Sequence, residues 1–310
     1  MEPIVKLQDL LITVKGEPTR SIAVAAGQDP DTILAVAKAV EEDVIKAVLV
    51  GDEKAILQVA EEKGVSSSLF DIVPAEDEES AALIAVRLVR EKKADMLMKG
   101  LVKTATYMKA VLDKERGLLP QGGLISHIAL MEIPAYPKLL IVSDAAIIPA
   151  PDLAQKIQIL NYAVEVANAI GNELPKVALV SATETISFNV QSSVDAAVIT
   201  AMTQRKQIKG AIVDGPLALD VSISPAHCLI KELVSPINGE ADILIFPNIE
   251  TANTFYKSTI LLARGTAASM LVGTNAPVVL TSRADDDDSK FYSIVLAAKM
   301  AAKKFFESAS

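Results

Sequence analysis

Short apolar segments recur along the chain, and a stretch with helical spacing of its apolar residues follows most of them. Because these segments do not alternate strictly between apolar and polar residues, we expect strands that are buried on both faces of a sheet. The predicted strands are residues 21–27, 46–51, 94–100, 124–131, 138–145, 176–182, 210–216, 241–248 and 276–282. The predicted helices are residues 31–42, 52–63, 78–91, 152–169, 192–205, 249–262 and 289–306.

Strands that alternate with helices predict an α/β protein with a largely parallel sheet covered on both faces. An open sheet of this kind binds ligands outside the carboxyl ends of its strands. Polar residues at predicted strand ends are therefore candidate site residues, although turns also require such residues. They are Lys99-Gly100, Ser143-Asp144, Ser181, Asp214-Gly215-Pro216, Asn248 and Ser282-Arg283.

Length and composition limit the class of protein. A chain of 310 residues with 51% apolar and 22% charged residues suits two folded domains. Two prolines in the segment IPAYP mark a change of composition near residues 131–138, where we expect a domain boundary. The net charge of −9 argues against general nucleic-acid binding, although a small phosphate ligand needs only local cations.

Other sequence features favour a cytoplasmic location and no membrane partner. No uncharged apolar run approaches the ~20 residues that a membrane-spanning helix needs. The first residues, MEPIVKLQDLL, contain no basic segment followed by an apolar core, so they predict no secretion signal. A single cysteine, Cys228, cannot form an internal disulfide.

Several common catalytic motifs are missing from the sequence. It contains no GxxxxGK[ST] or GxSxG segment, and no GxGxxG follows the early strands. His127 and His227 are the two histidines, which is too few for a multi-histidine metal site. We expect His127, within an apolar strand, to be a hydrogen-bonded core residue. His227 and Cys228 are neighbours on a predicted helix and should point in different directions.

The stretch from residue 239 to 283 carries the most informative pattern. One apolar run ends at Asn248, and Asn253 and Tyr256-Lys257 follow in a helical pattern. A second apolar run ends at Ser282-Arg283. Two strands joined by a helix and ending in donors and cations predict one wall of a site for an anionic ligand. The alternative for Arg283 is an ion pair with the acidic run at residues 285–288.

A second group of polar residues follows the predicted strand at residues 94–100 and opens a helix. Hydroxyl groups, lysines and the N–H groups at a helix start together suit a phosphate group. The alternative is a solvated basic helix face. The residues are Lys99, Lys103, Thr104, Thr106 and Lys109.

Several segments resemble one family. ADILIFPNIETANTFYK resembles the pattern of the phosphate acyltransferase family, and APVVLTSRAD followed by SKFYSIVLAAKMAA resembles its closing strand and helix. SDAAIIPAPDLAQKIQILNYAVEVA, KVALVSATET and IVDGPLALDVSIS are similar to its middle portion. The likeness runs from about residue 97 to the end of the chain. SRADDDDSK and LMKGLVKTATYMKAVLD are similar to the butyryl branch, phosphotransbutyrylase.

The resemblance implies a two-domain fold like that of isocitrate and isopropylmalate dehydrogenases, with a cleft between the domains. Residues 1–131 plus 273–310 would form one domain, and residues 132–272 the other. It also implies a homodimer or higher homo-oligomer. The reaction would be acyl-CoA plus phosphate giving acyl phosphate plus CoA, reversibly, with CoA as a substrate and neither a cofactor nor a metal.

The resemblance also implies roles for matching residues. Arg283 would meet the phosphoryl group or the developing oxyanion, and Ser282 would lie near the thiol sulfur. Phosphate would be bound by Lys99, Lys103, Thr104, Thr106 and Lys109, and CoA would face Asn253, Tyr256 and Lys257. The proposed aspartate base of the acetyl enzymes has no direct match, because Tyr292-Ser293 precede Ile294. Asp285 is the first candidate for the base, and Asp144 is the second.

Three alternatives remain open. The chain could be a phosphate acetyltransferase specific for acetyl-CoA. It could be a dehydrogenase, which rests on fold analogy without a cofactor motif. It could also be a non-catalytic CoA-sensing or dimerisation protein, although the pairs Ser282-Arg283 and Tyr256-Lys257 favour catalysis.

Overall fold

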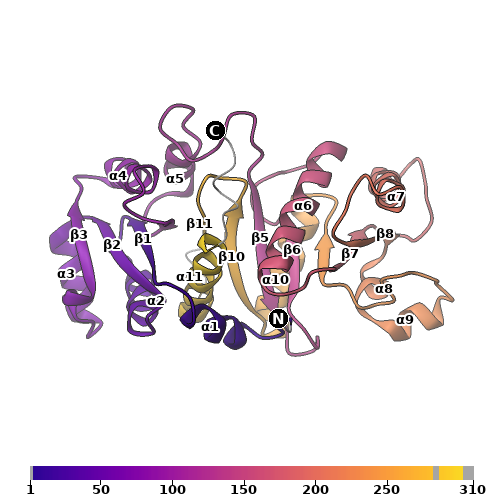
Figure 1. Ribbon diagram of the computed structural model, residues 1–310, viewed down its shortest axis with the longest axis horizontal. Helices are drawn as coiled ribbons and strands as arrows, with labels where there is room; N and C mark the ends of the chain where they lie inside the picture. The colour runs from indigo at the N-terminus through magenta and orange to yellow at the C-terminus, as the bar shows by residue number, and fades with distance from the viewer. Residues whose placement is uncertain (1–2, 282–285, 303–310) are drawn as a thin grey trace. The chain divides into compact units, whose positions relative to one another are not determined.

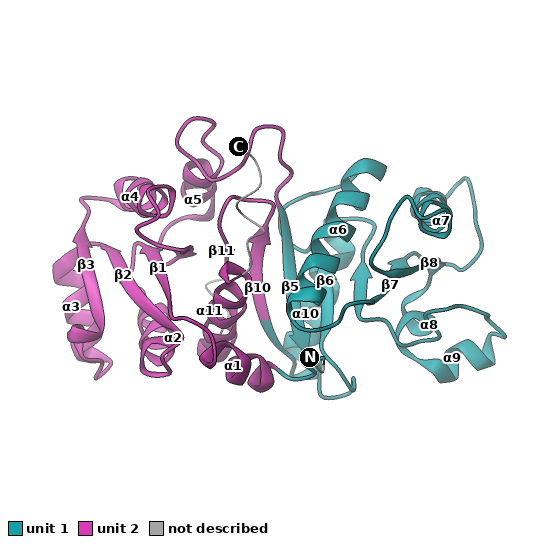
Figure 2. Ribbon diagram, viewed as in Figure 1, with its two compact units in different colours: residues 1–6, 126–267 teal, residues 7–125, 268–310 magenta. Residues whose placement is uncertain are grey.

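The computed structural model describes residues 3–281 and 286–302 (Figure 1). The chain forms two compact units (Figure 2). Unit 1 consists of Met1–Lys6 and Ser126–Ala267, and unit 2 consists of Leu7–Ile125 and Ala268–Ser310. Each unit is an α/β assembly with its own strands and covering helices.

Unit 2 contains strands in the order β3-β2-β1-β4-β11-β10. All of these neighbours are parallel except β10 and β11. The strands are β1 (Arg20–Ala25), β2 (Ile45–Gly51), β3 (Phe70–Pro74), β4 (Met96–Lys99), β11 (Val278–Val279) and β10 (Thr266–Val272), which begins at the end of unit 1. The helices are α1 (Leu7–Lys15), α2 (Pro30–Glu41), α3 (Glu53–Glu62), the 3-10 helix η1 (Ser67–Leu69), α4 (Glu78–Arg90), α5 (Thr104–Val111) and α11 (Asp287–Ala301).

Unit 1 contains strands in the order β5-β6-β9-β7-β8. β5 and β6 are antiparallel, and the other neighbours are parallel. The strands are β5 (Ser126–Glu132), β6 (Leu140–Ser143), β7 (Lys176–Val180), β8 (Ile212–Leu217) and β9 (Ile243–Ile245). The helices are α6 (Leu153–Ala169), α7 (Gln191–Gln204), α8 (Leu219–Ile223), α9 (Pro225–Ile230) and α10 (Ile249–Ala263).

The structure confirms the predicted α/β class with mostly parallel strands, and each predicted strand overlaps an observed one. Side-chain caps explain where many helices begin, because a side-chain oxygen accepts a hydrogen bond from a free N–H of the first turn. Such caps are formed by Asp29, Asp52, Asp77, Asp152, Asn248 and Asp286. Asp286, within the acidic run, therefore contributes a helix cap.

The structure adds elements that the prediction lacked, namely β3, β10, α1, α8 and the 3-10 helix η1. β3 lies at the edge of its sheet and buries only Phe70, so it has no apolar run. β10 is buried but starts with small residues, Ala267 to Ser269, which do not form a hydrophobic signal. α1 buries Leu7, Leu10, Leu11 and Val14, a helical spacing that is visible in the sequence.

In unit 2 the end of β4 approaches the end of β1 closely. A Cβ atom on Gly100 would lie 2.3 Å from the backbone oxygen of Ala26, so only glycine fits there. The backbone N–H of Leu101 donates to the same oxygen at 2.7 Å. This packing fixes the point at which the chain leaves β4 for α5.

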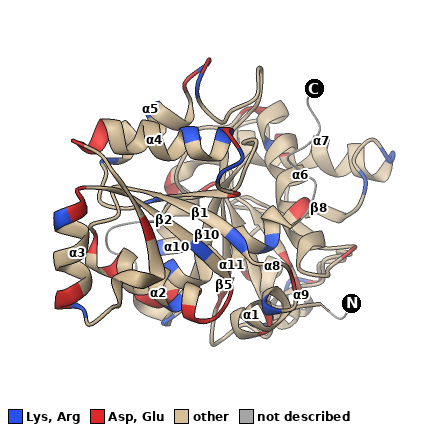
Figure 3. Ribbon diagram, turned by 60° about the vertical axis from the view of Figure 1, so that its left-hand side comes forward, with Lys and Arg blue, Asp and Glu red and all other residues tan. Residues whose placement is uncertain are grey.

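Charged residues of both signs are interspersed along the chain (Figure 3). The central strands β1 and β6 are mostly buried and apolar. Within the described residues, no helix is long and apolar enough to cross a membrane.

Candidate functional site

Three strand ends of unit 1 meet at one edge of its sheet. β6 and β9 are parallel, with Ser143 opposite Ile245, so both strands end at this edge. β5 runs in the opposite direction and begins there with Ser126 and His127. Such an edge is where α/β sheets present ligand-binding groups.

The Asp144 carboxylate is the centre of this edge. Asp144 is 3% exposed and accepts a hydrogen bond from the Ser126 hydroxyl at 3.0 Å. It also accepts from the backbone N–H groups of Ala146, Ile147 and Ile148 at 2.8, 2.9 and 3.3 Å. Because an ionised carboxylate offers about four lone-pair sites, these four donors occupy it fully. Asp144 therefore holds the loop after β6 in one conformation.

Helix α10 is fastened to the same loop. Asn253 Nδ2 donates to the backbone oxygen of Ala145 at 2.9 Å, and the N–H of Ile249 donates to Pro149 at 3.0 Å. Asn248 caps the helix through the N–H of Thr251 at 3.0 Å. The predicted residues Asn253 and Asp144 thus belong to one cluster, and Asn253 acts there as a donor to the loop.

His127 lies beside this cluster. It is 5% exposed, and its ring meets the ring of Tyr256 edge-on, with centroids 6.3 Å apart. Burial lowers the pKa of His127, and the charge of Asp144 opposes part of this shift. Its Nδ1 atom is buried without a hydrogen-bond partner within the described residues. The expected burial is therefore confirmed, but the expected full hydrogen bonding is wrong.

The second predicted group lies at the carboxyl end of β4 in unit 2. Lys99 is 4% exposed with its Nζ 3.3 Å from the oxygen of Gly100, and Lys103 is exposed directly before α5. Thr104 begins α5 in an exposed position, and Thr106 is half-buried. The expectation of a strand followed by a helix start is confirmed.

Two carboxylates of α4 already contact this group. Glu78 accepts from the backbone N–H of Lys103 at 3.1 Å, and Glu79 pairs with Lys109 at 2.8 Å. The hydrogen bond with Glu79 raises the pKa of Lys109. A phosphate at the start of α5 must therefore compete with Glu79 for Lys109.

The stretch from residue 239 to 283 differs from the prediction. In chain order, β10 lies between α10 and β11. β9 belongs to unit 1, whereas β11 belongs to unit 2. The predicted pair of strands joined only by a helix is therefore wrong, because the small residues of β10 concealed a strand. β11 is parallel to β4, with Val279 opposite Met98. Ser282, Arg283 and Asp285 lie outside the described residues.

His227 and Cys228 have separate partners. The His227 ring is 2.8 Å from the Ser224 hydroxyl, and the Cys228 thiol donates to the oxygen of Val221 at 3.2 Å. Burial raises the pKa of the Cys228 thiol. No Cys–His pair forms. In the described part of the chain, no three His, Cys, Asp or Glu side chains gather as a metal site.

The known proteins that are similar to this chain are acyltransferases. A phosphate butyryltransferase from Clostridium beijerinckii is 42% identical over 95% of this chain and 97% of its own length. A phosphate acetyltransferase from Thermotoga maritima is 42% identical over 95% and 99%. The crystal structure of a branched-chain phosphotransacylase from Enterococcus faecalis V583 is 35% identical, with a TM-score of 0.81 over 91% of this chain and 99% of that one.

The family described as phosphate acetyl/butaryl transferase matches residues 78–298. The chain therefore belongs to this family, which confirms the resemblance found in the sequence.

The buried imidazole of His127 predicts a specific dependence of stability on pH. Its folded pKa lies below the unfolded value of about 6.5, so the unfolded chain binds more protons as the pH falls below that value. The stability from neutral His127 is present above pH about 6.5 and is lost as the pH falls towards the folded pKa. Free energies of unfolding should depend less steeply on pH below 6.5 in His127→Gln than in the original chain. His227→Gln, at an exposed position, is the control and should keep the original slope; an unchanged slope in His127→Gln would contradict the assignment.

The Asp144 carboxylate gives a second prediction. Asp144→Asn replaces one acceptor oxygen by an amide that faces existing donors, so the free energy of unfolding should fall by about 1–3 kcal/mol. Denaturant titration measures this loss. Asp71→Asn, at an exposed position of β3, should change stability much less. Equal effects of the two substitutions would show that the hydrogen bonds of Asp144 do not stabilise the fold.

Proposed function

We propose that the chain catalyses the reversible transfer of a short-chain acyl group between CoA and inorganic phosphate. Its membership of the phosphate acetyl/butaryl transferase family carries this proposal. In the direction of acyl phosphate, a phosphate oxygen attacks the thioester carbonyl, the C–S bond breaks, and the thiolate takes up a proton as CoA leaves. The thioester is itself activated for acyl transfer, so the reaction needs neither a metal nor a cofactor.

We further propose that the preferred acyl group is butyryl or branched. A phosphate butyryltransferase at 42% identity and the branched-chain phosphotransacylase at 35% identity support this choice. The acetyltransferase from Thermotoga maritima, also at 42% identity, keeps an acetyl preference as the alternative. One methylene contributes only ~1–3 kcal/mol of discrimination, so a few side chains decide between them.

The proposed roles follow the sequence prediction. Arg283 stabilises the phosphoryl group or the oxyanion, and Ser282 donates a hydrogen bond near the sulfur. The start of α5 supports a phosphate role for Lys103, Thr104 and Thr106 in particular, because its N–H groups add to their donors. Lys99 and Lys109 belong to the same proposed group. On α10, Asn253, Tyr256 and exposed Lys257 face CoA, and Asn253 also holds the helix to the oxygen of Ala145.

Of the two proposed bases for the CoA thiol in the reverse reaction, Asp285 is the better candidate. The oxygens of Asp144 already accept four hydrogen bonds, which leaves no lone pair directed at a substrate proton. A base must lie within hydrogen-bond reach of the proton that it removes. Asp144 therefore supports the loop, and Asp285 accepts the proton.

Initial rates with acetyl-CoA, butyryl-CoA and a branched acyl-CoA, each with phosphate, test the substrate and the role of Arg283 together. We expect the highest kcat/KM for butyryl-CoA or the branched substrate. Arg283→Ala should lower turnover by ~10²-fold or more, because it removes a donor to the developing charge. Arg205→Ala removes an exposed cation after α7 and should retain activity. A preference for acetyl-CoA, or near-normal turnover in Arg283→Ala, would contradict the respective assignment.

We also propose that the chain acts in the cytoplasm and that the homo-oligomer implied by the resemblance, a homodimer or higher, is a homodimer. Exposed apolar side chains around α9 support self-association, since a large exposed apolar group favours burial against a partner. Leu229 is 79% exposed, Ile230 is 77% exposed and Val234 is 99% exposed.

Sedimentation analysis tests this dimer. The original chain should have twice the 32.8 kDa mass of one chain. A double substitution, Leu229→Glu with Val234→Glu, should shift the mass towards 32.8 kDa, because charge at a buried contact opposes association. Ile12→Glu, at an exposed apolar position of α1, is the control and should leave the dimer intact. A monomeric original chain, or a dimer that survives the double substitution, would contradict the proposal.

A further inference from the structure

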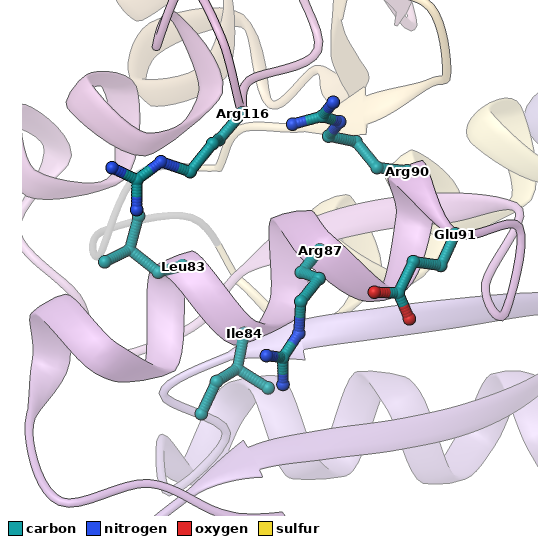
Figure 4. A pocket seen from close by; sticks show the side chains of 6 residues that line it. All are labelled: Leu83, Ile84, Arg87, Arg90, Glu91 and Arg116. Carbon is teal, nitrogen blue, oxygen red and sulfur yellow. The ribbon is translucent and has the colours of Figure 1, made fainter.

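A pocket in unit 2 brings three arginines together outside the proposed reaction site. It has a volume of about 470 Å³ and is lined by α4 and by the loop after α5. Figure 4 shows its lining residues, which are Leu83, Ile84, Arg87, Arg90, Glu91 and Arg116.

Helix spacing explains the part of the pocket that α4 provides. Leu83, Arg87 and Arg90 are four and three residues apart, so they share one face of the helix. Leu83 and Ile84 lie towards one end of this face, and Arg90 lies towards the other (Figure 4). The α4 side of the pocket therefore has an apolar end and a cationic end.

A tight turn delivers Arg116 to the pocket. Asp113 Oδ1 accepts hydrogen bonds from the N–H groups of Glu115 and Arg116 at 2.9 and 2.7 Å. A Cβ atom on Gly117 would lie 2.4 Å from the backbone oxygens of Asp113 and Val111, so the turn requires glycine. In Figure 4 the Arg116 side chain extends from this loop towards Leu83. The position of Arg116 is therefore built by local structure.

The three guanidinium groups are available to a ligand. Within residues 3–281 and 286–302, none of them has a carboxylate oxygen within the 4.0 Å of an ion pair. Glu91, the acidic residue of the lining, pairs with Lys93 at 2.7 Å. The dipole of α4 favours cations in its last turn, which accounts for Arg87 and Arg90 but not for Arg116.

The pocket is separate from the proposed phosphate residues of α5. Those residues contact the first turn of α4, through Glu78 and Glu79. Arg87 lies nine residues after Glu78, which corresponds to about 13 Å along a helix with a rise of 1.5 Å per residue. Arg87 and Arg90 therefore do not share the anion proposed at the start of α5, and Arg116 follows the opposite end of that helix.

We propose that this pocket binds a small molecule that carries at least two phosphate groups on an uncharged body. Arg87, Arg90 and Arg116 bind the phosphates, since guanidinium groups match phosphate oxygens in pairs. Leu83 and Ile84 contact the uncharged part. The volume lies within the range of about 300–1,000 Å³ typical of small-molecule sites and exceeds what inorganic phosphate would fill.

Two sources supply this chemistry: a free nucleotide such as ATP, and the 3′-phosphoadenosine diphosphate end of CoA. Calorimetric titration of the original chain with ATP and with CoA tests both. Arg90→Ala and Arg116→Ala should each weaken binding of the occupant about 10-fold or more, because each removes hydrogen bonds to charged oxygens. Arg205→Ala is the matched control and should bind as the original chain does.

The two sources give different results in the same variants. If the occupant is a free nucleotide, Arg116→Ala loses affinity for ATP while its KM for CoA stays unchanged. If the occupant is the nucleotide end of CoA, Arg116→Ala raises the KM for CoA and ATP competes with CoA. Affinities for ATP and CoA that are unchanged in both arginine variants would overturn the proposal. Acyl-transfer turnover of the original chain is measured separately, so failure here is distinct from failure of the proposed reaction.

Discussion

One buried carboxylate determines the arrangement of the candidate site in unit 1. An ionised group at 3% exposure is costly unless hydrogen bonds replace its water. Asp144 meets this condition only when Ser126 and three consecutive loop N–H groups point at it. The loop therefore adopts one conformation, and its carbonyl at Ala145 becomes the anchor for Asn253. The position of α10, and with it Tyr256 and Lys257, depends on this chain of hydrogen bonds.

A rigid edge of this kind suits acyl transfer. The reaction is accelerated by donors already in place when charge develops on the carbonyl and phosphate oxygens. In unit 2, the carboxyl ends of β4 and β11 are held by other contacts. Gly100 allows β4 to pack against β1, and the buried Tyr107 hydroxyl donates to the oxygen of Val279 at 3.3 Å. α5 is thereby tied to the strand that precedes Ser282 and Arg283 in the sequence.

The sequence predicts the fold well where burial leaves a pattern. Apolar runs mark the central strands, and Asp52 and Asp152 mark helix starts because a cap is a local interaction. The edge strand β3 and the small-residue strand β10 lack that pattern. Site residues at strand ends are visible from position alone, but their roles depend on distant partners. Asp144 accepts a hydrogen bond from Ser126, which lies 18 residues earlier in the chain. Arg116 and Arg87 are 29 residues apart in the sequence and line one pocket only in the folded chain.

The most direct test measures butyryl phosphate and free CoA thiol in the same reaction. Butyryl-CoA and inorganic phosphate are incubated with the chain, phosphorus NMR follows butyryl phosphate, and a thiol reagent follows free CoA. We expect a butyryl phosphate signal that grows in equal amount with free thiol, and that declines when excess CoA is added. Thiol release without butyryl phosphate would indicate thioester hydrolysis, and no thiol release would indicate a non-catalytic CoA-binding protein; either result would contradict the account.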